Sequence, residues 1–114
     1  MNVHTVLRKW NVRPDKALGQ NFLVDQTILR RIAEAAQLTS EDVVLEIGAG
    51  TGALTELLAQ DAGHVVALEL DQQLIPILEE ELSGFDNVSI VQGDILGLDP
   101  ADLVQKVRQQ HESS

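Results

Sequence analysis

The sequence predicts an α/β domain built on a parallel sheet, from three apolar runs and one glycine cluster in 114 residues. The runs lie near residues 43–47, 65–70 and 88–93, and helix-like stretches separate them. The glycine cluster follows the first run directly, as in the turns where open α/β sheets hold nucleotide-like ligands. The predicted architecture is a right-handed βαβαβ half of a Rossmann-like fold.

The N-terminal part is expected to be a basic arm, residues 1–21, ahead of one domain over residues 22–114. The arm shows no sustained apolar period, and Pro14 interrupts any helix in it. Asp25 is expected to be the N-cap of the first helix. The apolar face of that helix is predicted from residues at helical spacing: Ile28, Leu29, Ile32, Ala36 and Leu38.

The first two strands are apolar at almost every position, which is typical of strands covered on both faces of a parallel sheet. Between them, a helix of about ten residues is expected from Gly52, ended by Gly63. Its inward-facing residues are predicted to be Leu54, Leu57 and Leu58. A second crossover helix is expected from Asp71 to Leu82, with Pro76 tolerated in its first turns.

A last short amphipathic helix is expected after the third strand, opened by Asp99 or Pro100. Its apolar face is predicted from Leu103, Val104 and Val107. The helix is expected to fray over residues 109–114.

The charge of the chain is distributed unevenly. The net charge is −10, yet residues 1–31 hold six basic residues against two acidic ones. This pattern suggests a basic arm that binds phosphate groups, although a solvated tail explains it equally well.

The chain has no cysteine and its three histidines show no ligand spacing, so no disulfide or metal site is expected. No stretch has the length and apolarity of a signal peptide or a membrane span, and a cytoplasmic protein is expected.

The glycine turn matches the permissive dinucleotide fingerprint at Gly48, Gly50 and Ala53, which alone is a weak signal. Glu69 closes the second strand at close to the offset expected for an acid that binds ribose hydroxyls. Enzymes that use nicotinamide cofactors and enzymes that use S-adenosylmethionine share this arrangement.

Glu46, at the end of the first strand, separates these two classes better. A carboxylate beside the glycines repels a pyrophosphate, whereas it suits the ammonium group of S-adenosylmethionine. Asp94, after the third strand, is able to accept a hydrogen bond from an adenine amino group. The simpler alternative is that each of these acids is a surface residue at a strand end.

Four segments in this order carry a family resemblance: LGQNFLVD at residues 18–25, EIGAGTGALT at 46–55, ELD at 69–71 and GD at 93–94. Together they resemble the N-terminal part of the ribosomal RNA adenine dimethyltransferase family, the kasugamycin-sensitivity type of N6-adenine methylase. The resemblance covers residues 14–96, and the Gly-Gln-Asn-Phe-Leu segment is more specific than the glycine loop. It implies an S-adenosylmethionine-dependent methyltransferase fold, with ribosomal RNA or the small ribosomal subunit as partner.

The resemblance also implies roles for particular residues. Asn21, through its side-chain amide, and Leu23, through its backbone, would lie by the methionine end of the cofactor, with Gln20 nearby. Gly48, with Gly50 close by, would let the backbone approach the cofactor. In this family Glu69 would bind both ribose hydroxyls, Asp94 would read the adenine, and Glu46 would lie nearby.

The family's segment for holding the target adenine, Asn-(Leu/Ile)-Pro-Tyr, does not occur in this chain, which has no tyrosine. A fragment is therefore expected, one that holds the cofactor-binding half, contains no catalytic residue and is inactive by itself. The first strand would keep an unpaired apolar edge at residues 43–45, which favours self-association. Two alternatives remain: a fragment of a nicotinamide-dependent oxidoreductase, and a non-catalytic RNA-binding module on the same fold.

Overall fold

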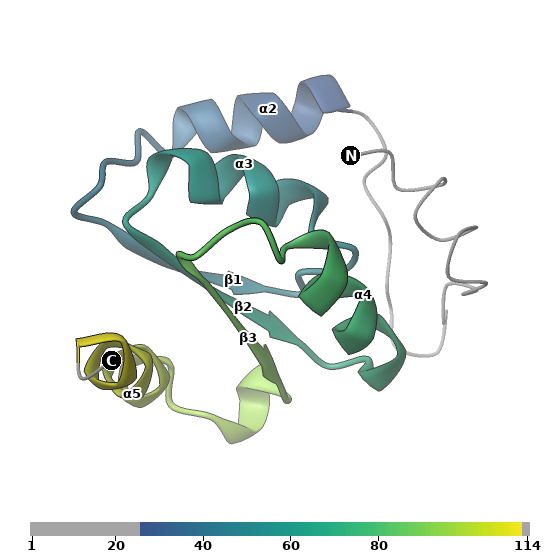
Figure 1. Cartoon of the computed structure of the whole chain (residues 1–114), viewed down its shortest axis with the longest axis vertical. Helices are drawn as coiled ribbons and strands as arrows, with labels where there is room; N and C mark the ends of the chain where they lie inside the picture. Colours follow the sequence, from purple (N-terminus) through teal and green to yellow (C-terminus); the bar gives the residue numbers. More distant parts are fainter. Residues whose placement is uncertain (1–25, 113–114) are drawn as a thin grey trace.

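The computed structural model describes residues 26–112, which form a three-stranded parallel sheet with helices on both faces (Figure 1). In chain order the elements are α2 (Gln26–Ala35), β1 (Val43–Ile47), α3 (Ala53–Asp61), β2 (His64–Glu69), a 3₁₀ turn (Gln72–Leu74), α4 (Ile75–Glu81), β3 (Val88–Gln92), a second 3₁₀ turn (Ile95–Gly97) and α5 (Pro100–Glu112). The strands lie in the order β1-β2-β3, and both pairs are parallel. The fold class predicted from the sequence is confirmed.

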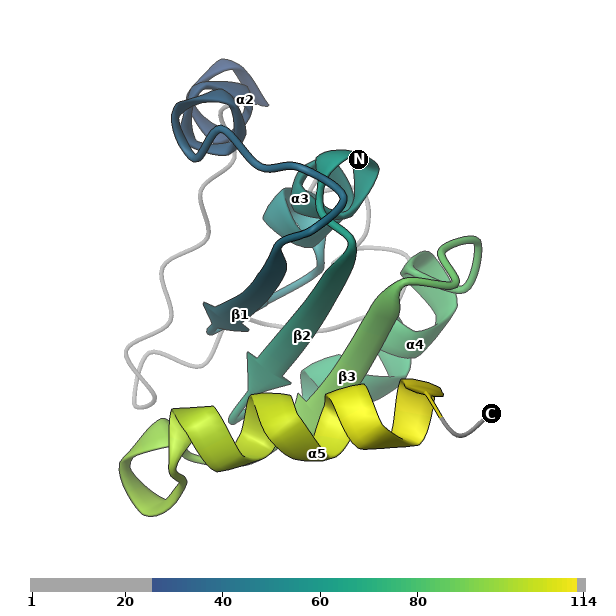
Figure 2. The same cartoon turned by 90° about the vertical axis from the view of Figure 1, so that its left-hand side faces the viewer.

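The helices divide between the two faces of the sheet. Figure 1 shows α2 lying on α3 on one side of the strands and α5 on the other side, and Figure 2 shows α5 crossing in front of the strands. Val65 packs against α2 and α3, and Ala67, two residues further along β2, packs against α4. Alternate residues of a strand point to the same face, so α2, α3 and α4 cover one face of the sheet.

The central strand and the edge strand differ in burial. Every residue of β2 is buried, as predicted for a strand covered on both faces. In β1, Val43, Val44 and Leu45 are only half-buried and Ile47 is 58% exposed, so the same prediction is wrong for β1. The reason is its place at the edge of the sheet, where β2 is its strand partner in the described part of the chain. The unpaired edge predicted for this strand is present there.

Helix α2 buries a narrower stripe than its sequence predicts. Leu29 is buried as predicted, together with Ala33, which was not predicted, whereas Ile28 and Ile32 are 46% and 42% exposed. The prediction is also wrong for Ala36 and Leu38, because the helix ends at Ala35, before both of them. The helix packs on α3 rather than across the sheet, so one row of side chains is enough to make the contact. The predicted N-cap and the boundary predicted after residue 21 lie outside the described residues.

Helix α3 brings a polar side chain into the core. Of the three leucines predicted to face inward, Leu58 is buried while Leu54 and Leu57 are half-buried. Thr55, which was not among them, is completely buried. After the helix, Gly63 fits under the turn that leads into β1, where a Cβ would collide with the backbone carbonyl of Ser40.

The remaining helices follow their predictions with two corrections. The helix predicted from Asp71 begins with the 3₁₀ turn that Asp71 caps, and α4 starts only at Ile75. Pro76 lies in the first turn of α4, as predicted. Helix α5 begins at Pro100 and Asp99 caps it, accepting a hydrogen bond from the amide of Ala101 at 2.9 Å. The predicted fraying from residue 109 is wrong, because the helix continues to Glu112. Residues 105–110 are rich in helix-favouring Lys, Arg and Gln. The buried side chain of Val107 holds the helix against the rest of the protein.

Within residues 26–112, no helix is long and apolar enough to cross a membrane. The same part of the chain holds no group of three His, Cys, Asp or Glu side chains arranged to bind a metal ion.

Candidate functional site

The glycine turn between β1 and α3 has three residues in the left-handed region of backbone conformation. Gly48, Gly50 and Gly52 have φ angles of +79°, +64° and +88°, which residues with a Cβ rarely adopt. The amides of Gly48 and Ala49 both donate to the carbonyl of Leu68, at 2.9 and 3.1 Å, so the turn is tied to the end of β2. The turn predicted from the sequence therefore lies at the carboxyl ends of the strands.

Two of these glycines have opposite surroundings. A Cβ on Gly52 would lie 3.3 Å from the side chains of Leu78 and Leu82, so this residue lets the turn pack against α4. A Cβ on Gly48 would meet no described atom within 4 Å, and Gly48 is exposed. Among residues 26–112, the space next to Gly48 is therefore open.

Glu69 at the end of β2 holds this turn in place. Its side chain is only 2% exposed. One carboxylate oxygen, Oε1, accepts a hydrogen bond from the amide of Gly50 at 2.7 Å, and Oε2 accepts one from the amide of Asp71 at 2.9 Å. Both carboxylate oxygens therefore accept hydrogen bonds from the backbone, one from the glycine turn and one from the loop after β2.

Glu46 lies on the same face of the sheet, one strand away. It is buried, and the hydroxyl of Thr55 on α3 donates a hydrogen bond to its Oε1. Burial raises the pKa of Glu46 to about 7, the bond from Thr55 opposes this rise, and the negative charge of Glu69 adds to it. Two carboxyl groups thus meet under the glycine turn, and one of them titrates near neutral pH.

Asp94 follows β3, whose end lies next to the end of β2, but its environment differs from that of Glu69. The amide of Gly93 donates to the backbone carbonyl of Glu69 at 3.0 Å, which joins the end of β3 to the end of β2. Asp94 is exposed, and its Oδ1 accepts from the amide of Leu96 at 2.9 Å, which caps the following 3₁₀ turn. Its carboxylate therefore faces solvent at the same end of the sheet as Glu69.

The structure brings together the predicted residues Glu46, Gly48, Gly50 and Glu69, with Asp94 at the neighbouring strand end. The other predicted site residues, Gln20, Asn21 and Leu23, lie outside the described residues. Sequence reasoning gave no role to Thr55 or to Asp71, which is buried and caps the 3₁₀ turn after β2. The sequence feature that could have pointed to Thr55 is its position as a single hydroxyl residue among the leucines of α3, nine residues after Glu46.

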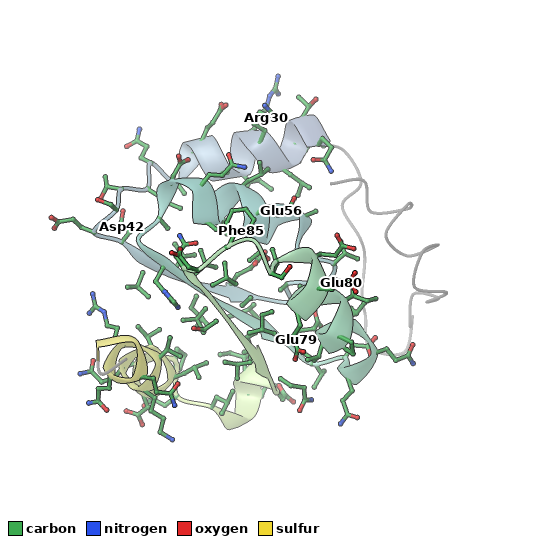
Figure 3. The ribbon with its side chains drawn as sticks, viewed as in Figure 1. Arg30, Asp42, Glu56, Glu79, Glu80 and Phe85 are labelled. Carbon is green, nitrogen blue, oxygen red and sulfur yellow. The ribbon has the colours of Figure 1, made fainter. Side chains whose placement is uncertain are left out.

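The charges of the described part of the chain are strongly asymmetric. Residues 26–112 hold sixteen acidic and four basic residues. Figure 3 shows Arg30 on the outer side of α2, and Glu79 and Glu80 on α4. The site itself offers carboxyl groups and an open glycine, which is an arrangement suited to a ligand with positive charge.

Comparisons with known proteins agree on one family. A family model described as ribosomal RNA adenine dimethylase matches residues 11–113. The ribosomal RNA small subunit methyltransferase A of Listeria innocua is 50% identical over 99 residues, which cover 87% of this chain and 34% of that protein. The chain thus spans about a third of the length of the curated relatives it matches.

Solved structures give the same result. The 23S rRNA methyltransferase ErmE is similar with a TM-score of 0.67 and 44% identity, over 70% of this chain and 33% of that one. A dimethyladenosine transferase from Plasmodium falciparum is similar with a TM-score of 0.62 and 36% identity, over 65% of this chain and 28% of that one. Both likenesses extend over the greater part of this chain but only a minor part of the other protein.

Proposed function

The chain belongs to the ribosomal RNA adenine dimethylase family, and from this premise we propose that it binds S-adenosylmethionine as the cofactor-binding part of an enzyme that dimethylates N6 of adenines in small-subunit ribosomal RNA. The observation that carries the proposal is the hydrogen bond from the Gly50 amide to Glu69. It directs an N–H group of the glycine turn to a carboxylate of the protein. The turn therefore favours a cationic ligand over a phosphate.

The turn fits this cofactor better than it fits a dinucleotide. A pyrophosphate binds such a turn through backbone N–H groups at the start of a helix. Here the Gly50 amide already donates a hydrogen bond to Glu69 at 2.7 Å. The carboxyl groups of Glu46 and Glu69 would also repel phosphate. S-adenosylmethionine carries an ammonium and a sulfonium group and no phosphate, and the open space at Gly48 accommodates a ligand. A nicotinamide-dependent oxidoreductase is not favoured.

The proposed contacts follow the chemistry of each group. Glu69, whose carboxylate is fixed at the end of β2 by the amides of Gly50 and Asp71, would accept hydrogen bonds from the ribose hydroxyls. The exposed carboxylate of Asp94 would accept from the adenine amino group. Glu46 would supply negative charge for the ammonium group.

The methionine end of the cofactor is proposed to meet residues outside the described range. Asn21 would contact it through the side-chain amide and Leu23 through the backbone, with Gln20 nearby. When bound, S-adenosylmethionine supplies an electrophilic methyl group. The residues of this chain bind and orient the cofactor, and we assign none of them to the transfer step itself.

The proposed nucleic-acid partner is expected to contact basic residues of the chain. Phosphates are repelled by the acidic body, whereas Arg30 and Arg31 are exposed on α2, next in the chain to the basic residues 1–21. Ribosomal RNA as substrate would place the protein in the cytoplasm.

Self-association is a further part of the proposal. The outer edge of β1, with half-buried Val43, Val44 and Leu45, offers backbone groups to a strand of another molecule. Sedimentation at increasing protein concentration tests this point. A monomer at all concentrations would remove it without affecting the cofactor proposal.

The proposed function is tested by calorimetric titration of S-adenosylmethionine into the chain and into two variants. Glu69→Gln replaces one accepting oxygen by an amide, and we expect at least about a tenfold loss of affinity from a hydrogen bond to a charged group. Glu79→Gln, an exposed residue on α4, is the matched control and should bind like the parent chain. Equal affinity for Glu69→Gln would remove Glu69 from the site, and no binding to the parent chain would refute the proposed function.

A further inference from the structure

We propose that binding of the cationic cofactor displaces a proton from Glu46, so that cofactor affinity depends on pH near neutrality. In the free protein Glu46 shares a buried position with a second acid, and part of the molecules carry a proton on Glu46 near neutral pH. On binding, the O–H bond of Glu46 breaks, the proton leaves to solvent, and the carboxylate pairs with the ligand's ammonium group. This inference rests on the proposed function, because it requires a positively charged ligand at the site.

The hydrogen-bond partner of Glu46 differs in kind from the partners of the neighbouring Glu69. Glu69 accepts from two backbone amides, at 2.7 and 2.9 Å, and an amide N–H donates to a carboxylate without being able to accept. Glu46 is paired with the hydroxyl of Thr55, which is able to donate or to accept. A proton on Glu46 is therefore compatible with its partner. Neighbouring carboxyl groups in different environments can have different chemical roles.

Within residues 26–112, the elements packed around Glu46 offer it no positive charge. From β2 it faces Glu69, and from α3 it faces the Thr55 hydroxyl. Leu78 and Leu82 of α4 pack on Ala67, the β2 residue in register with Glu46. The four basic residues between positions 26 and 112 are all exposed, on α2 and α5. Within the described part of the chain, the ammonium group of the ligand would be the first cation that this carboxyl group meets.

The pKa of Glu46 means that cofactor binding and proton release would be coupled near neutral pH. Burial raises the pKa of its carboxyl group to about 7, against the opposing effect of Thr55 and with a further rise from Glu69. At neutral pH about half of the free molecules then carry the proton. Cofactor binding at that pH would release the protons of this half.

Calorimetry of S-adenosylmethionine binding to the 114-residue chain, in buffers of different ionisation enthalpy, counts the protons released. Relative to Glu46→Gln, we expect the parent chain to release about half a proton more at about pH 7, and its relative affinity to rise about tenfold from about pH 6 to about pH 8. Glu46→Gln should lose this release, and Glu79→Gln should keep it. The ligand's own amino group titrates in all three proteins, so the difference between variants isolates Glu46.

A carboxyl ¹³C NMR titration of the free parent chain gives a second test that needs no variant. A midpoint for Glu46 near 7 supports the inference, and one near the ordinary value of a glutamate overturns it. Binding that is independent of pH, without proton release, overturns the inference and leaves the proposed function standing. Absence of binding at every pH overturns both.

Discussion

Replacing Glu46 by Gln should remove a loss of stability that the chain otherwise suffers as the pH rises. Burial raises the pKa of this group from an ordinary value of 4.5 to about 7, so between these values the folded protein holds a proton that the unfolded chain has released. The stability contributed by Glu46 is therefore fully present below about pH 4.5 and is lost as the pH rises through about 7. At 1.36 kcal/mol per pH unit, the loss amounts to about 3 kcal/mol at most.

The assay is urea unfolding followed by circular dichroism, at several values from about pH 5 to about pH 8, for the parent chain and two variants. Glu46→Gln keeps an acceptor for Thr55 and has no charge to bury, so its stability relative to the parent should increase by about 2 to 3 kcal/mol over this range. Glu79→Gln should follow the parent. An unchanged difference between Glu46→Gln and the parent across the pH range would refute the reasoning.

Two further predictions concern neighbouring features. Thr55→Val removes the hydroxyl whose hydrogen bond lowers the pKa of Glu46, so the titration midpoint of Glu46 should move upward in a carboxyl ¹³C NMR titration, and a downward move would contradict the assignment of the bond. Gly63→Ala places a methyl group against the carbonyl of Ser40 and should lower the free energy of unfolding by about 1 to 3 kcal/mol, with Gly84→Ala, where a Cβ meets open space, as the control. Equal unfolding midpoints for the two alanine variants would show that the turn before β1 moves at little cost.

The local pattern of the sequence was sufficient for much of the fold. An apolar run bounded by Asp42 and a glycine predicts β1 at residues 43–47, and the structure has the same bounds. The three positions of the β1–α3 turn that have a left-handed backbone are glycines, so this turn could also be predicted from residue types alone. Burial was harder to predict, because an apolar strand reads the same at the centre and at the edge of a sheet. The exposure of Ile28 and Ile32 has a similar cause, since it depends on which partner α2 packs against.

The partners of the site residues could not be predicted from local sequence. The bond from Gly50 to Glu69 joins residues 19 apart in the chain, and the bond from Thr55 to Glu46 joins two different elements. Such contacts are set by how the helices pack on the sheet, which no short-range pattern specifies. The sequence placed acids at strand ends, and the structure added that one of them is tied to backbone amides while another is buried beside a hydroxyl. This difference is the basis of the proposed proton coupling.

The central claim is that the glycine turn receives a cation and not a phosphate. The most direct test is equilibrium binding of S-adenosylmethionine and of NAD⁺ to the same preparation of the 114-residue chain under identical conditions. We expect saturable, one-to-one binding of S-adenosylmethionine and no binding of NAD⁺ at the same concentrations, because the Gly50 amide is bound to Glu69 and two acids lie under the turn. Binding of NAD⁺ as tight as that of S-adenosylmethionine, or tighter, would contradict the account.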